Sequence, residues 1–210
     1  SESVSVDYDT FRTLLIDDAG PHESFVATLP TFAELNFTLP DDPSNPFTLS
    51  PTMDVNAATA KAVGIDPAFI TLPTSQYDPT ETRDATIEFN ADPYALDNGG
   101  GAPAFFDYDR SNGIQPGYID FTWVAIHEIG HALGFRSAVD SVDAALGAAA
   151  GNRTIQLQPL DLFRFEPGDG GEDFTNGARA LDPNLDHVFY DGGTFDPIDL
   201  PIPGLQIGDI

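Results

Sequence analysis

The stretch FTWVAIHEIGHALGF, residues 121–135, carries the clearest structural pattern in this chain. It is largely apolar apart from two histidines and the glutamate between them, and it contains no proline. Asp120 precedes it and is a good N-cap residue, while Gly134 can end a helix in the left-handed conformation. We therefore predict a buried helix over residues 121–133.

His127 and His131 are four residues apart in this stretch. On an α-helix this spacing places both imidazoles on one face, so both can bind a single zinc ion. Glu128 lies to the side of the pair, where it can act as general base on a water that the metal activates. The plainer alternative is a surface His–Glu–His cluster. The apolar character of the helix argues against it, because buried polar groups need partners.

Composition restricts the classes of partner. Acidic residues outnumber basic ones 34 to 8, and the net charge of −26 repels phosphate backbones and anionic membranes. We therefore expect no nucleic-acid partner and no membrane insertion. The absence of cysteine excludes disulfides, a thiol nucleophile and Cys-ligated metals. The chain starts without a signal-peptide pattern, so we expect that any such peptide has been removed.

Elsewhere the chain shows weaker patterns. Apolar spacing predicts a helix over Tyr8–Asp18, and Asn56 and Gly64 are placed to cap a short helix over residues 57–63. Residues 139–150 suggest a further helix, and the alternation in residues 84–90 predicts a half-buried strand. We expect three irregular regions, namely residues 30–52, residues 92–117 with a tight turn at Asn112-Gly113, and the turn-rich residues 151–210.

The run HEIGHALGF resembles the extended HExxHxxG motif of the metzincin-like zincins, and residues 84–143 resemble a family of secreted bacterial metalloproteases. The resemblance implies one α+β domain of the zincin fold, with a twisted mixed sheet and the active-site helix in an upper lobe, about 1–135. An irregular lower lobe would follow, about 136–210. It also implies a secreted zinc endopeptidase acting on a peptide or protein substrate. Such a substrate pairs with an edge strand, for which residues 86–90 are our candidate.

The third zinc ligand departs from the metzincin pattern. The expected His or Asp is replaced by Ser137, and serine is a poor zinc ligand. His187 follows the helix at a distance like that of leishmanolysin-type enzymes, so it is the candidate third ligand, with a solvated turn residue as the plainer alternative. We expect His22 to be an ordinary loop residue. Carboxylate alternatives for the third ligand are Asp140, Asp143, Asp161 and Glu166.

Two further features concern whether the domain continues beyond this sequence and whether it binds calcium. Met53 is the only methionine and precedes the helix, so the methionine turn of the family is missing, and we expect the fold to continue beyond Ile210. Oxygen-rich runs at residues 107–113 and 168–173 are candidate Ca²⁺ loops, and a flexible surface loop explains the second equally well. A plain turn is favoured for the first, because its glycine falls one place late for an EF-hand.

Two alternatives to a complete enzyme stay open. A non-catalytic metal-binding or adhesive surface module would account for Ser137 and the missing methionine turn. An incomplete fragment of an active protease would account for them equally well. The presence of Glu128 argues against the non-catalytic module, because a purely structural zinc site does not need a general base.

Overall fold

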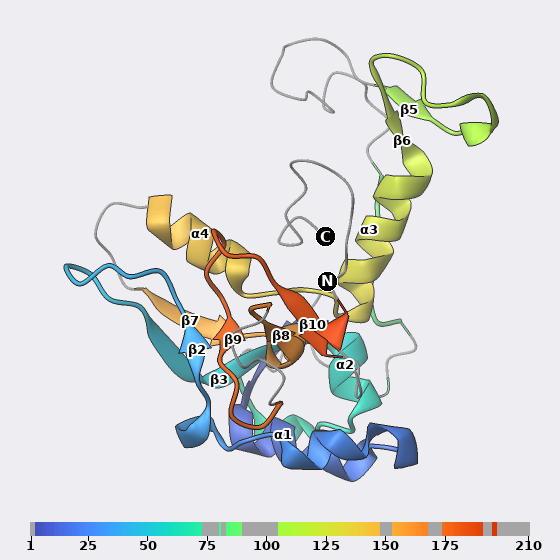
Figure 1. Ribbon diagram of the computed structural model, residues 1–210. Helices are drawn as coiled ribbons and strands as arrows, with labels where there is room; N and C mark the ends of the chain where they lie inside the picture. The colour runs from blue at the N-terminus through green and yellow to red at the C-terminus, as the bar shows by residue number, and fades with distance from the viewer. Residues whose placement is uncertain are drawn as a thin grey trace.

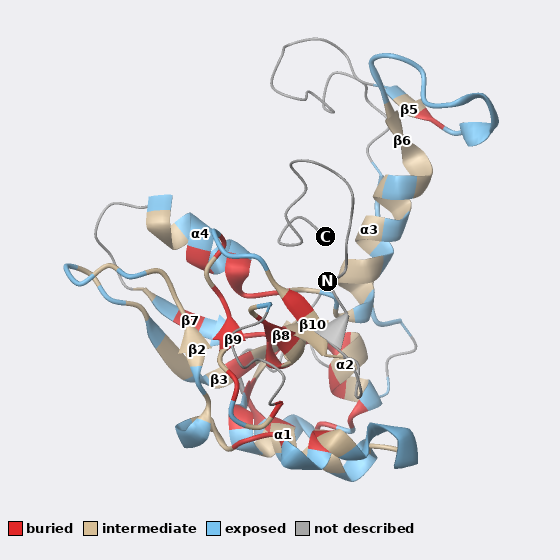
Figure 2. Cartoon of the chain, in the orientation of Figure 1, coloured by how far each residue is buried: buried red, intermediate tan, exposed pale blue. Residues whose placement is uncertain are grey.

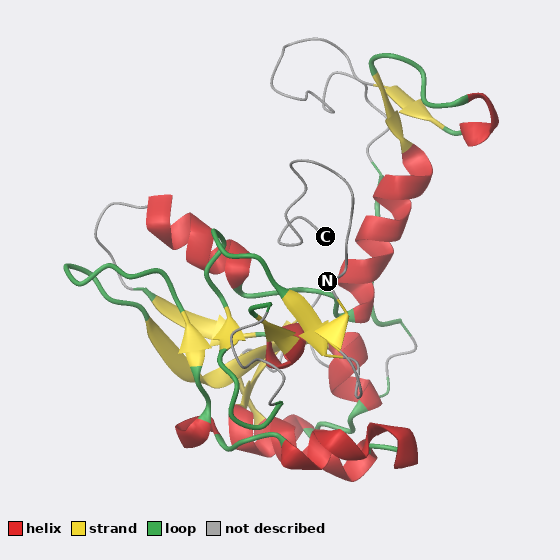
Figure 3. Ribbon diagram, viewed as in Figure 1, coloured by secondary structure: helices red, strands yellow, loops and turns green. Residues whose placement is uncertain are grey.

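The computed structural model describes residues 3–72, 80, 83–89, 105–147, 153–167, 174–190 and 195–196. It confirms the α+β class, with mixed sheets (Figures 1 and 3). The α-helices of these ranges are α1 (Tyr8–Asp18), α2 (Ala57–Ala62), α3 (Phe121–Leu133) and α4 (Val139–Gly147). The 3₁₀ helices are η1 (Pro21–Thr28), η2 (Phe32–Glu34), η3 (Pro67–Phe69), η5 (Arg110–Asn112) and η6 (Pro159–Phe163). No helix within the described ranges is long and apolar enough to cross a membrane.

The first sheet has the strand order β4-β1-β3-β7. Its strands are β1 (Ser3–Asp7), β3 (Thr48–Asn56), β4 (Ile70–Leu72) and β7 (Thr154–Leu157). β1 runs antiparallel to β3 and β4, whereas β3 and β7 are parallel. Alternate residues of β1 and β3 point into the core, where Val4, Val6, Met53 and Val55 are buried against Phe11 of α1.

The second sheet has the order β11-β10-β8-β9-β2 and consists of very short strands. They are β2 (Phe37–Thr38), β8 (Arg164–Phe165), β9 (Arg179–Ala180), β10 (Val188–Tyr190) and β11 (Phe195–Asp196). Both larger sheets combine strands from the two sides of residue 135, because β7 joins the first and β2 joins the second. Each of the two expected lobes, about 1–135 and 136–210, therefore contributes one strand to the sheet that the other lobe mainly forms.

Three expectations about irregular regions are wrong. The lower lobe, about 136–210, was predicted to be irregular, yet its described residues include α4 and the strands β7 to β11. Residues 30–52 contain η2, β2 and the first part of β3, and their pairing partners lie far away in the sequence. Residues 92–117 were expected to be loop, yet Phe105–Asp107 forms β5, which pairs in parallel with β6 (Tyr118–Asp120). The tight turn at Asn112-Gly113 is confirmed, because Gly113 has a φ of 82° and its N–H bonds the carbonyl of Arg110.

The helix α3 projects from the body of the protein toward β5 and β6 (Figure 1). Buried residues gather around the larger sheets and α1, whereas α3 has none (Figure 2). The prediction of a buried helix is therefore wrong, although its bounds are confirmed. Burial thus does not count against a surface His–Glu–His cluster, and that alternative stays open. Asn56 ties the C-terminal end of α3 to α2, because its side-chain amide donates to the carbonyls of His131 and Ala132 at 3.3 and 2.8 Å.

Candidate metal centre

The candidate metal ligands stand on a helix with both ends capped as predicted. The Asp120 carboxylate accepts hydrogen bonds from the N–H groups of Thr122 and Trp123 at 2.9 and 3.3 Å. At the other end Gly134 adopts the left-handed conformation, with φ 97° and ψ 8°. These caps satisfy backbone groups that would otherwise fray the first and last turns, so the intervening histidines lie on regular backbone.

His127 and His131 turn their rings toward each other. Their Nε2 atoms are 3.0 Å apart and their ring centroids 4.5 Å apart. A tetrahedral zinc ion with Zn–N bonds of about 2.1 Å holds two nitrogen ligands roughly 3.4 Å apart, so the observed pair would have to open by about 0.4 Å. The two nitrogens therefore fit as two ligands of one zinc ion. Without an ion, the same contact is an N–H···N hydrogen bond.

The surroundings of His131 indicate which of its nitrogens is free. Its Nδ1 lies 3.3 Å from the carbonyl oxygen of Phe135, which can only accept a hydrogen bond. The proton of the neutral ring is therefore on Nδ1, and Nε2 directs a lone pair toward His127. Histidines that bind metals are commonly oriented in this way by a backbone carbonyl at the second nitrogen.

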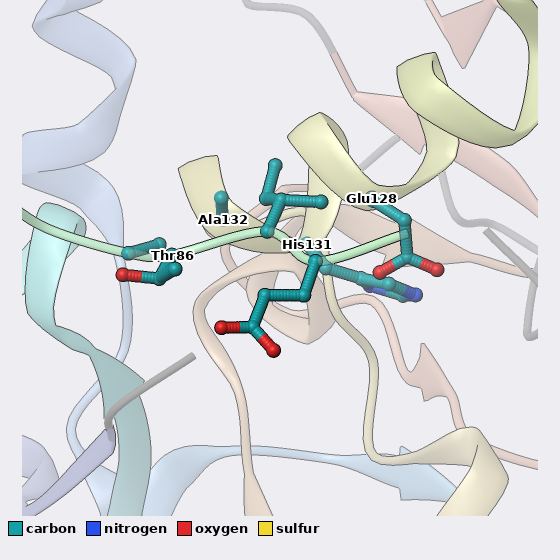
Figure 4. Close-up of a pocket in the computed structure, with 7 residues that line it drawn as sticks. Thr86, Glu128, His131 and Ala132 are labelled. Atoms are coloured by element: carbon teal, nitrogen blue, oxygen red, sulfur yellow. The ribbon is translucent and has the colours of Figure 1, made fainter. Parts of the chain in front are cut away.

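A pocket of about 240 Å³ lies beside His131. The structure places Glu128, His131 and Ala132 of α3 on one side of it and residues 85–88 on the other. Figure 4 shows Glu128, His131 and Ala132 on α3 and Thr86 on the facing segment, all of which line the pocket. Glu88 also lines this pocket and was missed as a site residue. The available sign was the alternation in residues 84–90, which puts Thr86 and Glu88 on one face.

The facing segment is extended but is not the predicted strand. Ala85 and Ile87 are half-buried while Thr86 and Glu88 are exposed, as the alternation predicts. Within the described ranges, however, no backbone group of residues 85–89 makes a hydrogen bond. The alternation thus predicts the extended backbone correctly, but this segment pairs with no other strand within the described ranges. The ion pair of Asp84 with Lys61, at 2.8 Å, holds one end of this segment near α2.

Ser137, at the position of the missing third ligand, belongs to a buried polar network. Its hydroxyl donates to Asp161 Oδ1 at 2.6 Å, and Asp161 also accepts from the N–H of Gln158 at 2.7 Å and of Ala138 at 3.1 Å. Asp161 is fully buried, and this burial raises the pKa of its carboxyl to about 6 despite the hydrogen bonds. Arg164 donates to the Ser137 hydroxyl at 3.2 Å. Asp161 therefore serves the fold in this arrangement.

The same network holds His187. Nη2 of Arg164 lies 2.9 Å from His187 Nδ1, and a guanidinium nitrogen can only donate. With Arg164 donating to Nδ1, the proton of the neutral ring is on Nε2, which is buried and has no hydrogen-bond partner within the described residues. In this arrangement neither nitrogen has a lone pair free for a metal. Burial, assisted by the charge of Arg164, lowers the pKa of His187 to about 4.

Among the residues that the structure describes, no third ligand lies at the histidine pair. No group of three His, Asp or Glu side chains that could hold a metal occurs within the described ranges. His187 as third ligand thus stays a prediction, without support from its contacts. Of the carboxylate alternatives, Asp140 and Asp143 are exposed on α4 and Glu166 is half-buried, while His22 is exposed in η1.

The candidate calcium run at residues 107–113 forms a turn. The Asp107 carboxylate accepts from the N–H groups of Asp109 and Gln115, both at 3.0 Å. Asp109 accepts from Ser111, and these hydrogen bonds lower the pKa of the Asp109 carboxyl. The carboxylates are thus occupied in shaping the loop, as the turn interpretation expects. The other candidate run, residues 168–173, lies outside the described residues.

Comparisons of this chain with protein-family models, with characterised proteins and with solved structures find no match.

Proposed function

We propose that this chain is a zinc-dependent endopeptidase of the zincin type, with His127 and His131 as zinc ligands and Glu128 as general base. The observation that carries the proposal is the convergence of the two Nε2 atoms, 3.0 Å apart, beside a pocket lined by Glu128. A bound zinc ion would supply Lewis-acid activation of a water molecule and of the scissile carbonyl. The HEIGHALGF run adds the resemblance to secreted metalloproteases, from which secretion is also proposed.

Glu128 would move the protons in this reaction. It lines the same pocket as His131, where a carboxylate can take a proton from the attacking water and return it to the leaving amine. One side of the pocket is extended backbone, and residues 85–89 make no backbone hydrogen bonds within the described part of the protein. Their backbone groups would pair with the main chain of a peptide, which favours an endopeptidase.

The number of histidines restricts which residue could be a third nitrogen ligand. The chain has four histidines, and His22 lies exposed in η1. A third nitrogen ligand from this chain would therefore be His187, which would have to exchange its bond with Arg164 for the metal. A carboxylate is the other class of ligand that zinc accepts here.

The proposal is tested with zinc-loaded protein and an unfolded protein as substrate. Glu128→Gln is expected to lower the hydrolysis rate by roughly 10²- to 10⁴-fold and to leave zinc affinity unchanged. Glu88→Gln is the matched control, because it removes a carboxylate from the same pocket. Equal activity of the Glu128→Gln variant and the unmodified chain would overturn the assignment. Tight zinc binding with no hydrolysis would favour the non-catalytic module instead.

A further inference from the structure

The two candidate ligands differ in how their rings are held. His131 has the carbonyl of Phe135 at its Nδ1, which is the usual way to orient a histidine that binds a metal. Nδ1 of His127 is buried and has no hydrogen-bond partner within the described part of the chain. A histidine ring without such a bond can rotate about χ2, where the torsional preference is broad. The orientation of His127 therefore depends on the contact of its Nε2 with His131 and on the packing of its ring.

Trp123 provides that packing. It lies one helical turn before His127, and the two rings stack with centroids 5.6 Å apart and planes inclined by 27°. The ring of His131 meets His127 edge-on, with an interplanar angle of 83°. Residues four apart on a helix are held by the backbone at contact distance, so the stack is built into α3. The indole thus restricts the rotation that would turn Nε2 of His127 away from His131.

Core packing does not account for this tryptophan. Trp123 is 38 % exposed, and no residue of α3 is buried. Ile126, also apolar and on the same helix, is 62 % exposed and has no aromatic ring to stack on a histidine. A large aromatic ring at a half-exposed position, stacked on a candidate ligand, has its clearest physical consequence for that ligand.

We infer that Trp123 is a positioning residue for the first zinc ligand: by stacking on the imidazole of His127 it takes over the orienting role that the Phe135 carbonyl performs for His131. The inference rests on the proposed zinc site. If it holds, Trp123 raises the zinc affinity of the site without touching the metal.

The size of the effect follows from the energy of aromatic pairs. Such pairs contribute about 0.5–1.5 kcal/mol beyond their buried area, which corresponds to roughly a 2- to 12-fold change in affinity. Trp123→Leu is expected to weaken zinc binding by that factor. Trp123→Phe keeps an aromatic face and is expected to bind within about 2-fold of the unmodified chain. Ile126→Leu is the control for a conservative change on the same helix.

The experiment is a competition titration of zinc against a chromophoric chelator, which needs no catalytic activity, with circular dichroism to verify that each variant keeps its helices. The inference is overturned if Trp123→Leu binds zinc as tightly as the unmodified chain, or if Ile126→Leu weakens binding equally. Failure of the unmodified chain to bind zinc would instead overturn the proposed function together with this inference. The two failures are therefore distinguishable.

A second readout follows from composition, because Trp123 is the only tryptophan of the chain. Cobalt(II) bound at His127 would lie close to the stacked indole and would quench its fluorescence. We expect strong quenching on cobalt titration of the unmodified chain and its loss in His127→Ala. Binding of cobalt by the chelator assay without any change in tryptophan emission would contradict the stacked arrangement.

Discussion

Replacing Asp161 by asparagine is expected to change how the stability of this protein depends on pH. Asp161 is fully buried and receives hydrogen bonds from Ser137, Gln158 and Ala138. Burial raises the pKa of its carboxyl from 3.8 to about 6 in the folded protein. The folded state therefore binds this proton more tightly than the unfolded chain, and ionisation of Asp161 costs stability.

The sign and size of this pH dependence follow from the thermodynamic linkage between proton binding and folding. Because the folded pKa is the higher one, the contribution of Asp161 to the free energy of unfolding is largest below pH 4 and falls as the pH rises to about 6. A difference of about two pKa units corresponds to roughly 3 kcal/mol. His187 acts in the opposite direction, because its pKa is lowered to about 4, so its contribution is lost as the pH falls from about 6.5.

The assay is therefore a comparison of two proteins. The free energy of unfolding is measured in urea, by circular dichroism, for the unmodified chain and for Asp161→Asn between pH 4 and pH 7. We expect the stability advantage of the unmodified chain over the variant to shrink by about 2 kcal/mol across this range, because a small part of the roughly 3 kcal/mol is already lost at pH 4. Asp143→Asn, an exposed aspartate of α4, controls for the charge change. An advantage that stays constant, or that grows with pH, would refute the reasoning.

Further predictions concern the junction of α2 and α3. Gly134→Ala is expected to lower the free energy of unfolding by about 2 kcal/mol or more, because φ is +97° and the added Cβ would collide with Thr59 Oγ1. Gly64→Ala is the matched control: its φ is +73° and nothing lies near the added Cβ, so only the backbone strain, about 1 kcal/mol, is expected in urea unfolding. Equal losses in the two variants would contradict the close contact. Asn56→Asp keeps the oxygen that caps α2 but loses both hydrogen bonds to the last carbonyls of α3, at a cost of about 1–3 kcal/mol. A thermal melt indistinguishable from that of the unmodified protein would count against this contact.

Helices were predictable from this sequence because their boundaries are encoded locally. Asp120 and Gly134 bracket α3, and Asn56 caps α2 through its own side chain, within three residues of the group it bonds. The strands were harder, because their partners are distant: β3 pairs with β1 and with β7. Residues 30–52 look irregular in isolation, and pairing turns their last part into a strand.

The candidate site likewise combines features that local sequence predicts with contacts between distant residues that it does not. His127, Glu128 and His131 lie within five consecutive residues of one helix, so their spacing in the sequence is enough to identify them. The bond of His187 to Arg164 joins residues 23 positions apart, and no periodicity predicts it. Ser137 looked like a vacant ligand position, whereas its hydroxyl is bonded to Asp161. The exposure of α3 was unpredictable for the same reason: an apolar sequence states what a helix could bury and leaves open what covers it.

The central claim is that His127 and His131 together hold a zinc ion. The most direct measurement is the zinc content and affinity of the purified chain, by equilibrium dialysis with elemental analysis, beside His127→Ala, His131→Ala and the control His22→Ala. We predict one zinc per chain, affinity lowered by at least about 100-fold in the first two variants, and no change in the third. Zinc binding that survives both the His127→Ala and the His131→Ala substitution would contradict the account.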